Sequence, residues 1–486
     1  MEKEKISLVE KLSDSRDSSL AGSPLMGVLV MAAGKGSRMK SDLPKVLHNI
    51  LDKPMLGYLL KTLTEIQDMQ IPCAEIAVLV GHRAEQVTEY LKSFPSVTIL
   101  QQKEQLGTGH AVQTTREWWE KFDLLLVLNG DLPLLKASTI QSLLFLFKEY
   151  QTPRLACALI SFMAQNPDGY GRVIRSKSGI RIIEHKDASQ EDRAVREVNA
   201  GCYLFDVQSL SRVIGELKND NAQKEYYLPD VLTLMNDQGM KISAAVADET
   251  EMRGVNTQAE LAGVTKCARD AILFDWMEKG VNILDPNAVW VGSDAKLAKG
   301  VSLAPLVQIW GDSVVGEDCD IGPNCVLRNA RLGARVKLVA NVIVEDSDIE
   351  DDAKAGPFAY IREKSLLKTK AFAGKFVELK KTTVGAGSKV PHLSYMGDAV
   401  LGSDVNIGAG SVTCNYDGKQ KHSTKIGDRC FVGSDTMMVA PVSLGSDSMT
   451  AAGSVITEDV PDGSLGVGRA RQKNCADWVY RKKASE

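Results

Sequence analysis

The chain has 486 residues, more than the roughly 250 to 300 residues at which single hydrophobic cores stop growing, so two or three domains are expected. Its 62 acidic and 58 basic residues nearly balance, which gives no electrostatic footprint for nucleic acid or a membrane surface. No apolar run is long enough to span a membrane, and the nine cysteines are scattered without a C-x-x-C pair, which favours a cytoplasmic protein with reduced thiols and no zinc site.

The chain begins with residues 1–25, which are charged and Ser-rich and contain no apolar core. This composition is not that of a secretory signal, and it predicts a poorly ordered extension.

The first predicted element is an apolar run at Gly27–Met31, typical of a parallel strand buried on both faces. It leads into AAGKGSRM. A strand followed by a Gly-containing turn and a helix offers backbone N–H groups and a helix N-terminus to an anion, and Gly34 and Gly36 would let a phosphate approach closely. Three basic residues would add positive charge: Lys35, Arg38 and Lys45. An ordinary strand-turn-helix is the alternative, because the motif is neither a Walker A loop nor a full G-x-G-x-x-G.

Strand and helix patterns then alternate. An apolar strand is predicted at 74–81, a helix to about residue 92, and a strand at VTILQQ before the loop KEQLGTGHA. Residues 123–135 predict a second buried strand that ends on Asp131. Ligands of open α/β sheets gather at the carboxyl ends of strands, so Asp131 is a candidate metal ligand. The alternatives are a turn or capping aspartate, and a helix cap at Asn256.

Residues 257–280 predict one long connecting helix. Five apolar residues recur along one helical face: Leu261, Val264, Ala268, Ile272 and Trp276.

A six-residue repeat fills the region from 281 to 461, before a C-terminal tail at 462–486. A period of six fits neither a helix nor a lone strand, and it predicts a hexapeptide β-helix in which stacked coils bury aliphatic residues that no single coil could bury. The series runs through Leu303, Ile309, Val315, Ile321 and Leu327, then Leu332, Leu338 and Val344, then Val384, Val390, Met396, Leu401, Ile407 and Thr413, and finally Ile426, Val432, Met438, Leu444, Thr450 and Ile456. Residues 345–383 are less regular.

The repeat is interrupted between Thr413 and Ile426, which are thirteen positions apart instead of six. CNYDGKQKHS is therefore expected to bulge outward as a loop. The segment VPHLSYMGD, with His392 three residues before Tyr395, precedes it.

Several motifs occur together in one order: AAGKGSRM, DLPKVL, QLGTGHA, GDLPL, GYGR, EHKDA, VNAG, EYYLPD and GVN. In this order they resemble the sugar-nucleotide pyrophosphorylases. With the hexapeptide region, the resemblance narrows to the GlmU family of bifunctional uridyltransferases and acetyltransferases, from about residue 26 to about 478. It implies an α/β protein with a Rossmann-like nucleotidyltransferase domain at 26–256, a linker helix and a left-handed parallel β-helix.

For the first activity, the resemblance implies that UTP and N-acetylglucosamine 1-phosphate give UDP-N-acetylglucosamine and pyrophosphate. Lys45 and Arg38 would act on the phosphates, and Asp131 and Asn256 would hold Mg²⁺. The nucleotide and sugar would contact Met31, Ala32, Ala33, Gly34, Gln102, Gly107, Thr108, Asn129, Gly130, Gly171, Glu184 and Asn199. Two positions depart from the family pattern, because Asn129 replaces a tyrosine and Ala200 replaces a threonine.

For the second activity, the resemblance implies acetyl-CoA-dependent N-acetylation of glucosamine 1-phosphate. The attacking amine must lose a proton, and imidazole exchanges protons near neutral pH, so His392 would be the general base. An isolated surface histidine is the alternative. The sugar phosphate would contact Arg362, Lys380, Tyr395, Asn406 and Lys421. Acetyl-CoA would contact Ala409, Asn415, Tyr416, Ser434, Ala452 and Arg469. Cys414 is not required, because the amine can attack the thioester directly.

The resemblance also implies a homotrimer with acetyl-transfer sites at the subunit boundaries, and a cytoplasmic enzyme that binds neither nucleic acid nor a membrane. Two other interpretations stay open. One is a nucleotidyltransferase whose β-helix is only a structural or regulatory scaffold. The other is a non-catalytic binding protein with a degenerate site.

Overall fold

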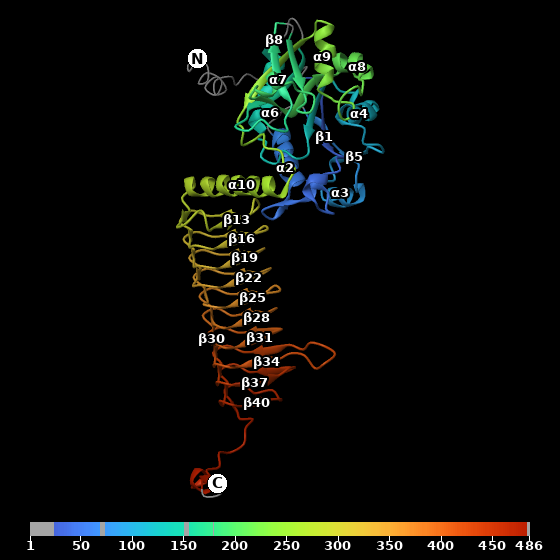
Figure 1. The fold of residues 1–486 in the computed structure, drawn as a ribbon. Coiled ribbons are helices and arrows are strands. Elements are labelled where there is room, and N and C mark those ends of the chain that lie inside the picture. Colours follow the sequence, from blue (N-terminus) through green and yellow to red (C-terminus); the bar gives the residue numbers. More distant parts are fainter. Residues whose placement is uncertain (1–23, 69–72, 150–154, 178, 484–486) are drawn as a thin grey trace. The chain divides into compact units, whose positions relative to one another are not determined.

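The structure, a computed structural model, describes residues 24–68, 73–149, 155–177 and 179–483. All but the last two residues of the extension expected at 1–25 lie outside these ranges. The chain divides into two compact units, Met1–Val264 and Thr265–Glu486, whose folds are shown in Figure 1. In the described ranges, no helix is long and apolar enough to cross a membrane.

The first unit is built on one mixed sheet. Its strands are Met26–Ala32 (β1), Cys73–Val80 (β4), Val97–Gln101 (β5), Leu124–Asn129 (β6), Leu155–Met163 (β7), Arg172–Ser176 (β8), Gly179–Ile183 (β9), Glu197–Asp206 (β10) and Lys241–Ala247 (β11). They run in the order β11-β7-β10-β6-β1-β4-β5, with the β8–β9 hairpin paired to β10. The strands β6, β1, β4 and β5 are parallel, whereas β10 lies antiparallel between β6 and β7.

Helices and short connecting elements surround this sheet. The helices are Met55–Asp68 (α2), Ala84–Leu91 (α3), Thr108–Thr114 (α4), Arg116–Trp119 (α5), Ala137–Glu149 (α6), Gln190–Arg193 (α7), Val207–Val213 (α8) and Asp230–Asp237 (α9). The short elements are the 3₁₀ turns Ser37–Met39 (η1), Lys45–Leu47 (η2) and Ile214–Glu216 (η3), and a small hairpin of Asn49–Ile50 (β2) and Lys53–Pro54 (β3).

Both faces of the central strands are buried. Val28 and Val30 of β1 belong to one hydrophobic cluster, and Leu29 between them belongs to a second cluster on the other face. Alternate residues of a strand point to opposite faces, so a strand covered on both sides must be apolar throughout. This explains the continuous apolar run from which β1 was predicted.

A single helix, Gln258–Glu278 (α10), begins in the first unit and ends in the second, because the boundary between the units falls after Val264. Val264 and Ala268 on its predicted apolar face are buried, and Ile272 and Trp276 pack partly buried against the core of the second unit.

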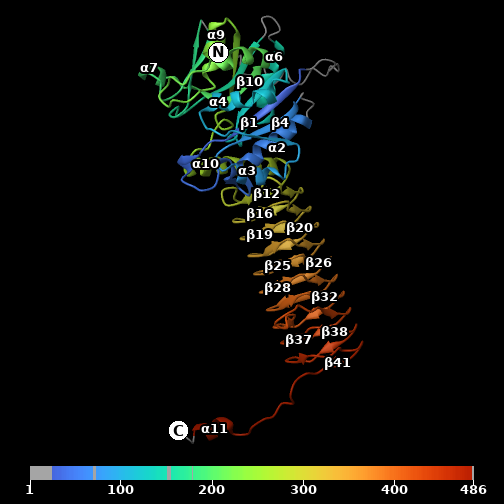
Figure 2. The same cartoon turned by 90° about the vertical axis from the view of Figure 1, so that its right-hand side faces the viewer.

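The second unit is a prism of three parallel sheets (Figure 2). Sheet I contains Asn282–Ile283 (β12), Ser302–Leu303 (β15), Asp320–Ile321 (β18), Lys337–Leu338 (β21), Lys354–Ala355 (β24), Phe372–Lys375 (β27), Lys389–His392 (β30), Asn406–Ile407 (β33), Phe431–Val432 (β36), Met449–Thr450 (β39) and Leu465–Gly466 (β41). Sheet II contains Trp290–Val291 (β13), Gln308–Trp310 (β16), Val326–Arg328 (β19), Ile343–Glu345 (β22), Tyr360–Arg362 (β25), Glu378–Lys380 (β28), Tyr395–Gly397 (β31), Val412–Cys414 (β34), Met437–Val439 (β37) and Val455–Ile456 (β40). Sheet III contains Lys296–Leu297 (β14), Val314–Val315 (β17), Arg331–Leu332 (β20), Asp348–Ile349 (β23), Leu366–Leu367 (β26), Thr383–Val384 (β29), Ala399–Leu401 (β32), Thr424–Ile426 (β35) and Val442–Leu444 (β38).

The six-residue series forms the core of this prism. Each of its members is buried, from Leu303 and Ile309 to Ile456, and successive coils stack in register, as in Ile309↔Leu327 and Val432 on Ile407. The prediction of stacked hexapeptide coils is confirmed. The stretch 345–383, which looked irregular in sequence, forms coils of the same kind. The coils continue to β41, beyond the boundary expected at 461, and the tail contains the short helix Trp478–Lys483 (α11).

Candidate active sites

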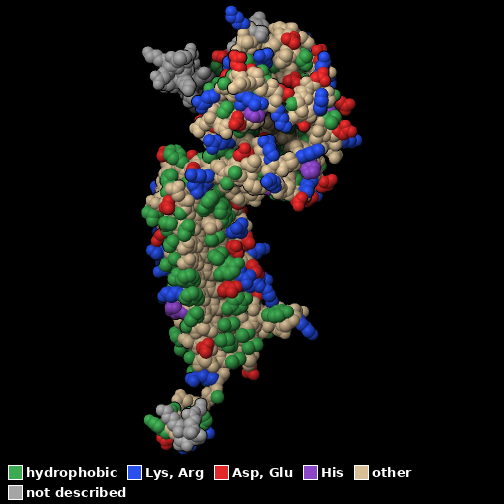
Figure 3. Space-filling model, in the orientation of Figure 1, with side chains coloured by type: hydrophobic (Ala, Val, Ile, Leu, Met, Phe, Trp, Pro, Cys, Tyr) green, Lys and Arg blue, Asp and Glu red, His purple; other side chains and the backbone are tan. Residues whose placement is uncertain are grey.

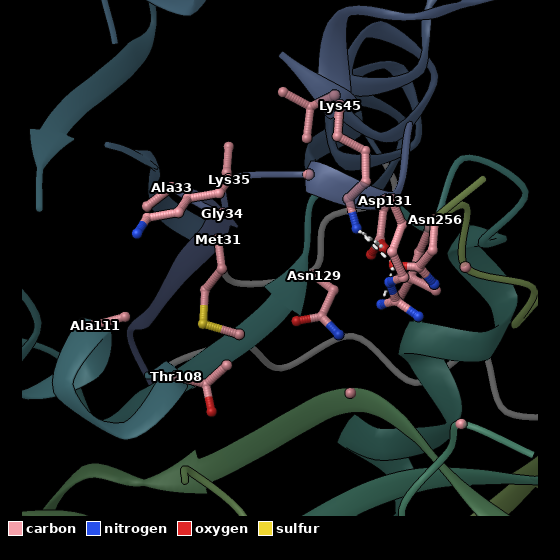
Figure 4. A pocket seen from close by; sticks show the side chains of 18 of the residues that line it. Met31, Ala33, Gly34, Lys35, Lys45, Thr108, Ala111, Asn129, Asp131 and Asn256 are labelled. Atoms are coloured by element: carbon pink, nitrogen blue, oxygen red, sulfur yellow. Dashed lines mark hydrogen bonds and ion pairs between the residues drawn. The ribbon is translucent and has the colours of Figure 1, made fainter. Parts of the chain in front are cut away.

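A cavity of about 670 Å³ opens in the first unit at the carboxyl ends of β1 and β6 (Figure 4). The residues predicted to bind nucleotide, sugar or metal line it, with Gly130 as the exception: Met31, Ala32, Ala33, Gly34, Arg38, Lys45, Gln102, Gly107, Thr108, Asn129, Asp131, Gly171, Glu184, Asn199 and Asn256. Gly130 lies against β1, and its N–H donates to the Met31 carbonyl at 2.9 Å. Residues that are distant in sequence therefore meet in one cavity.

The glycine turn after β1 differs from its prediction. We expected an α-helix whose N-terminus faces the cavity, but Ser37–Met39 form one 3₁₀ turn between two left-handed residues, Gly36 at φ 59° and Lys40 at φ 49°. A left-handed residue ends a helix, and Pro44 disfavours the α conformation of the residue before it. Gly34 has open space around it, whereas a Cβ at Gly36 would lie 2.9 Å from the Cβ of Lys45. The turn thus contributes backbone and cations, but no α-helix dipole.

Lys45 links the two candidate metal ligands. Its ammonium lies 2.6 Å from Asp131 Oδ2 and donates to Asn256 Oδ1 at 3.1 Å, and the Arg38 guanidinium also donates to Asn256 Oδ1 at 2.9 Å. Figure 4 shows Lys45, Asp131 and Asn256 converging on one side of the cavity. The Lys45 and Asp131 side chains are only 19% and 13% exposed, so this ion pair is poorly screened by water.

The side chain of Asn256 does not cap the helix that follows. The cap is Thr257, whose hydroxyl accepts from Glu260 N–H at 3.2 Å while the Glu260 carboxylate accepts from the N–H groups of Asn256 and Thr257. This reciprocal capping box satisfies the helix end. The amide of Asn256 is therefore available to face Lys45 and Arg38.

Asp131 and Asn256 are suited to bind Mg²⁺. Their oxygens both lie within hydrogen-bond distance of a single cationic atom, Lys45 Nζ, so one cation can contact both. Within the described ranges, no group of three or more His, Cys, Asp or Glu side chains is arranged to hold a metal. Two protein oxygens suit Mg²⁺, which keeps water and substrate phosphate oxygens as its other ligands.

One edge of the cavity is formed by Gln102, Gly107 and Thr108. The buried Gln102 side chain bonds to His110 Nδ1 at 3.1 Å, and the Thr108 hydroxyl accepts from Leu228 N–H at 3.0 Å. Gly107 has φ 112°, and a Cβ there would lie 2.5 Å from the Tyr226 carbonyl oxygen. Only glycine fits at this position.

Another part of the cavity lining contains Gly171, Glu184 and Asn199. Asn199 N–H donates to the Gly171 carbonyl at 2.9 Å, and its side-chain amide donates to the Tyr203 hydroxyl at 2.6 Å. Burial, followed by the nearby Asp230 and Asp187 carboxylates, raises the pKa of Glu184 from 4.5 to about 7. Glu184 therefore changes charge near neutral pH.

The cavity also contains residues that the sequence did not single out: Ser37, Val46, Gln105, Ala111, Leu132, Asp168, Gly169, Tyr170, Gly201, Glu225, Met252, Gly254 and Glu260. Several of them adjoin predicted residues inside the quoted motifs, as Tyr170 does in GYGR and Gly201 in VNAG. Their position next to predicted residues in these motifs was the signal that could have identified them from the sequence. Glu225 likewise begins the motif EYYLPD, whereas Met252 lies outside the quoted motifs and no local pattern marks it.

In the β-helix, three candidate sugar-phosphate residues lie on sheet II. Arg362 of β25 pairs with Lys380 of β28, and β28 pairs with β31, which carries Tyr395. Arg362 donates to Glu378 Oε1 at 2.7 and 2.9 Å. Close approach to Lys380 lowers the pKa of the Lys421 ammonium. Two ammonium groups side by side favour an anion between them.

The predicted loop is an arm formed by residues 415–423 between β34 and β35 (Figure 1). Tyr416 and Lys421 pair antiparallel, and His422 N–H donates to the Asn415 carbonyl. At the tip, the Asp417 carboxylate accepts from two backbone N–H groups and lies 2.7 Å from His422 Nε2. These bonds lower the pKa of Asp417. The arm is thus an ordered hairpin.

The remaining candidates occupy other parts of the prism. Ala409, Ser434 and Ala452 stack in successive coils at the corner after sheet I: Asp435 N–H donates to the Ala409 carbonyl and Gly453 N–H to the Ser434 carbonyl, and Arg469 lies beside Gly453. His392 is exposed at the end of β30, and Asn406 lies on β33, both in sheet I. One chain therefore presents His392 and Asn406 on a different sheet from Arg362, Lys380 and Tyr395.

Comparisons with known proteins cover both units. The MobA-like NTP transferase domain matches residues 28–186, and the hexapeptide repeat of succinyl-transferase matches residues 423–458. The bifunctional protein GlmU of Fervidobacterium nodosum is 43% identical over 458 residues, which covers 94% of this chain and 98% of the relative. The proteins of the same name from Thermoanaerobacter pseudethanolicus and Streptomyces avermitilis are each 41% identical and cover 93% and 94% of this chain, and 97% and 94% of their own lengths.

Proposed function

The chain belongs to the GlmU family of bifunctional proteins, and we propose that its two units bind their substrates through the residues described above. It is a bifunctional enzyme of UDP-N-acetylglucosamine biosynthesis that acetylates glucosamine 1-phosphate and then transfers a uridyl group to the product. The relatives match both units, which disfavours the alternative in which the β-helix is only a scaffold.

For uridyl transfer, the proposal rests on the convergence of the predicted residues in one cavity. A phosphate oxygen of N-acetylglucosamine 1-phosphate attacks the α-phosphorus of UTP, the bond from that phosphorus to the bridging oxygen breaks, and pyrophosphate leaves. Lys45 and Arg38 neutralise charge at the phosphates. The Gln102–Thr108 edge holds the uracil, and the part of the lining with Glu184 and Asn199 holds the sugar.

Asp131 and Asn256 would hold the Mg²⁺ of this reaction. When bound, Mg²⁺ would supply positive charge to the phosphate oxygens. The convergence of both side-chain oxygens on Lys45 Nζ supports this assignment.

For acetyl transfer, the amine of glucosamine 1-phosphate attacks the thioester carbonyl of acetyl-CoA. The new C–N bond forms and the C–S bond breaks. His392 takes the proton from the amine and passes it to the departing sulfur, so that CoA leaves as the thiol. Arg362, Lys380 and Lys421 bind the sugar phosphate, and the pKa of Lys421, lowered by its neighbour Lys380, supports an anion here. Asn415 and Tyr416 on the arm, and the column Ala409, Ser434, Ala452 and Arg469, bind acetyl-CoA.

Exposed apolar residues on the β-helix support self-association as a homotrimer. Phe358 and Phe376 stack at 5.1 Å in left-handed corner positions, and both are at least 50% exposed, as is Leu393 in the next coil. Figure 3 shows hydrophobic side chains along the β-helix. A prism turns its sheets away from one another, so a second copy is needed to bring sheet II opposite sheet I. Equilibrium sedimentation should give a trimer, and an active monomer would contradict the assembly.

We place the enzyme in the cytoplasm, where UTP and acetyl-CoA are available. Fractionation of cells that express the chain tests this location.

One assay tests the whole proposal. The protein is incubated with glucosamine 1-phosphate, acetyl-CoA, UTP and Mg²⁺, and free CoA thiol and pyrophosphate are followed independently. Both products should appear, and pyrophosphate should lag behind the thiol because acetylation supplies the uridyl acceptor. Pyrophosphate formed only from added N-acetylglucosamine 1-phosphate would indicate a nucleotidyltransferase alone, and release of neither product would contradict both activities.

A further inference from the structure

Asp398 is a nearly buried carboxylate at the base of the arm. It follows β31 in a left-handed conformation, with φ 49°, and its backbone N–H donates to the Lys380 carbonyl at 3.0 Å. Its own carbonyl accepts from Thr424 N–H, where the arm rejoins the prism. The side chain is 11% exposed. Asp398 thus lies between the strand that carries Lys380 and the end of the arm.

The two oxygens of Asp398 have different partners. Oδ2 accepts from Asn415 Nδ2 at 2.6 Å, and Oδ1 lies 3.6 Å from Lys381 Nζ. An ionised carboxylate can only accept hydrogen bonds, so the amide NH₂ of Asn415 must face Asp398. The amide oxygen of Asn415 must then point the other way. The hydrogen bond to Asp398 thus fixes which side of the Asn415 amide carries the NH₂ group and which side carries the oxygen.

Gly397, the residue before Asp398, lies where the candidate residues for the two substrates of acetyl transfer meet. A Cβ on Gly397 would collide with the Tyr395 hydroxyl and would lie 2.6 Å from Asn415 Nδ2. Tyr395 was assigned to the sugar phosphate and Asn415 to acetyl-CoA. Asp398 therefore supports the arm beside residues proposed for both substrates. It ends the segment VPHLSYMGD, in which the sequence singled out only His392 and Tyr395 as site residues.

We propose that Asp398 is a positioning residue for acetyl transfer, which orients the Asn415 amide so that its oxygen faces the reacting substrates as a hydrogen-bond acceptor. The natural donors are the amine of the sugar and the amide N–H groups of the acetyl donor. The inference rests on the proposed acetyl transfer at this site, and it adds a residue that acts through Asn415.

A matched control lies three coils away, at the corner of the prism that follows sheet II, where Asp398 also lies. Asp346 is also left-handed, with φ 46°, its N–H donates to the Arg328 carbonyl, and its Oδ1 accepts from Asn329 Nδ2 at 2.9 Å. An aspartate that bonds an asparagine amide is therefore a recurring feature of this corner. The difference is burial, because Asp346 and Asn329 are exposed, whereas Asn415 is buried.

The test compares Asp398→Gly, Asp398→Asn and Asp346→Gly. Glycine adopts φ near 50° without strain, so it removes the carboxylate while the corner is kept. Losing a charged hydrogen bond of this kind should lower kcat/KM for acetyl transfer by about 10- to 100-fold in Asp398→Gly, with a raised KM for acetyl-CoA. Asp398→Asn can still accept through its amide oxygen and should recover most of this loss. Asp346→Gly should match the parent.

Unfolding temperature and both activities are measured for each variant. A purely structural role would lower the folded fraction, and hence the apparent kcat, without changing KM for acetyl-CoA. The proposal is overturned if Asp398→Gly keeps the parental KM and kcat, or if Asp346→Gly loses as much activity. If Asp398→Gly does not fold, the small loss that remains in Asp398→Asn is compared with Asp346→Asn. The proposal requires a raised KM for acetyl-CoA in Asp398→Asn but not in Asp346→Asn, and an equal KM in both variants would overturn it. A parent that releases no CoA would instead contradict the proposed function.

Discussion

The two candidate sites of this chain are built in opposite ways. In the first unit, β1 and β6 end at the same edge of one sheet, and loops from both sides converge there, so one chain encloses a cavity of about 670 Å³. In the β-helix, every sheet faces outward, and the candidate residues are divided between sheet I, sheet II, a corner and the arm. A concave sheet edge can complete a site by itself, whereas we propose that the convex prism presents partial sites that a second copy completes.

The largest expected effect is on the candidate site of the β-helix, and it should leave the site of the first unit unchanged. His392→Ala should reduce acetyl transfer by about 10²- to 10⁴-fold, because a positioned general base contributes that much. Uridyl transfer from supplied N-acetylglucosamine 1-phosphate should be unchanged, since His392 is outside the first unit. Separate kcat/KM measurements for the two reactions check this, and parental acetyl transfer would show that the base lies elsewhere.

The reciprocal change is Lys45→Ala. Removing a preorganised cation beside the reacting phosphates should lower uridyl transfer by about 10²- to 10³-fold. The same substitution leaves Asp131 without its 2.6 Å partner, so Mg²⁺ dependence should change as well. Acetyl transfer should keep its rate. If CoA release fell in parallel with pyrophosphate release, the two sites would not be independent.

A smaller effect concerns pH and the first unit alone. The pKa of Glu184 is raised to about 7, so the group is mostly neutral at pH 6 and mostly ionised at pH 8. An ionised carboxylate accepts hydrogen bonds from sugar hydroxyls, so KM for N-acetylglucosamine 1-phosphate should fall as pH rises through 7. Glu184→Gln should flatten this dependence, because an amide does not titrate there. An identical pH profile for variant and parent would assign the ionisation to another group.

Glu184 also links pH to stability. Its pKa is higher in the folded state than the ordinary 4.5, so the folded protein binds more protons between about pH 4.5 and 7. Its contribution to stability is therefore fully present below pH 4.5 and is lost as pH rises through 7. Unfolding temperatures of Glu184→Gln and the parent should converge at low pH, with the parent less stable at pH 8.

The smallest expected effect is that of Cys414→Ala. Cys414 lies on β34 beside the arm, where a thiol could be mistaken for an acyl carrier. Direct attack by the amine needs no acyl-enzyme, so acetyl transfer should continue at the parental rate. Loss of CoA release in this variant, with its unfolding temperature retained, would require a covalent mechanism instead.

Sequence patterns predicted the parts of the fold that repeat or alternate. The six-residue series identified core residues such as Ile309 and Val432 because spacing along the chain directly determines stacking in the prism. The left-handed Lys40, which stops the expected helix after Gly36, carries no comparable signal. The charge state of Glu184 depends first on its burial and then on the Asp230 and Asp187 carboxylates, and both the burial and the approach of Asp230 arise only in the folded chain. The role of Asp398 likewise depends on its contact with Asn415, 17 residues away.

The most direct test of the central claim is complementation between two inactive variants. His392→Ala alters sheet I, and Lys380→Ala alters sheet II, and each alone should abolish acetyl transfer. If the site forms between copies, randomly mixed trimers made by co-expression should regain about a quarter of the parental acetyl-transfer rate, because a quarter of the boundaries would pair two intact faces. No recovery in verified mixed trimers would contradict the account, since it would show that one copy supplies both residues.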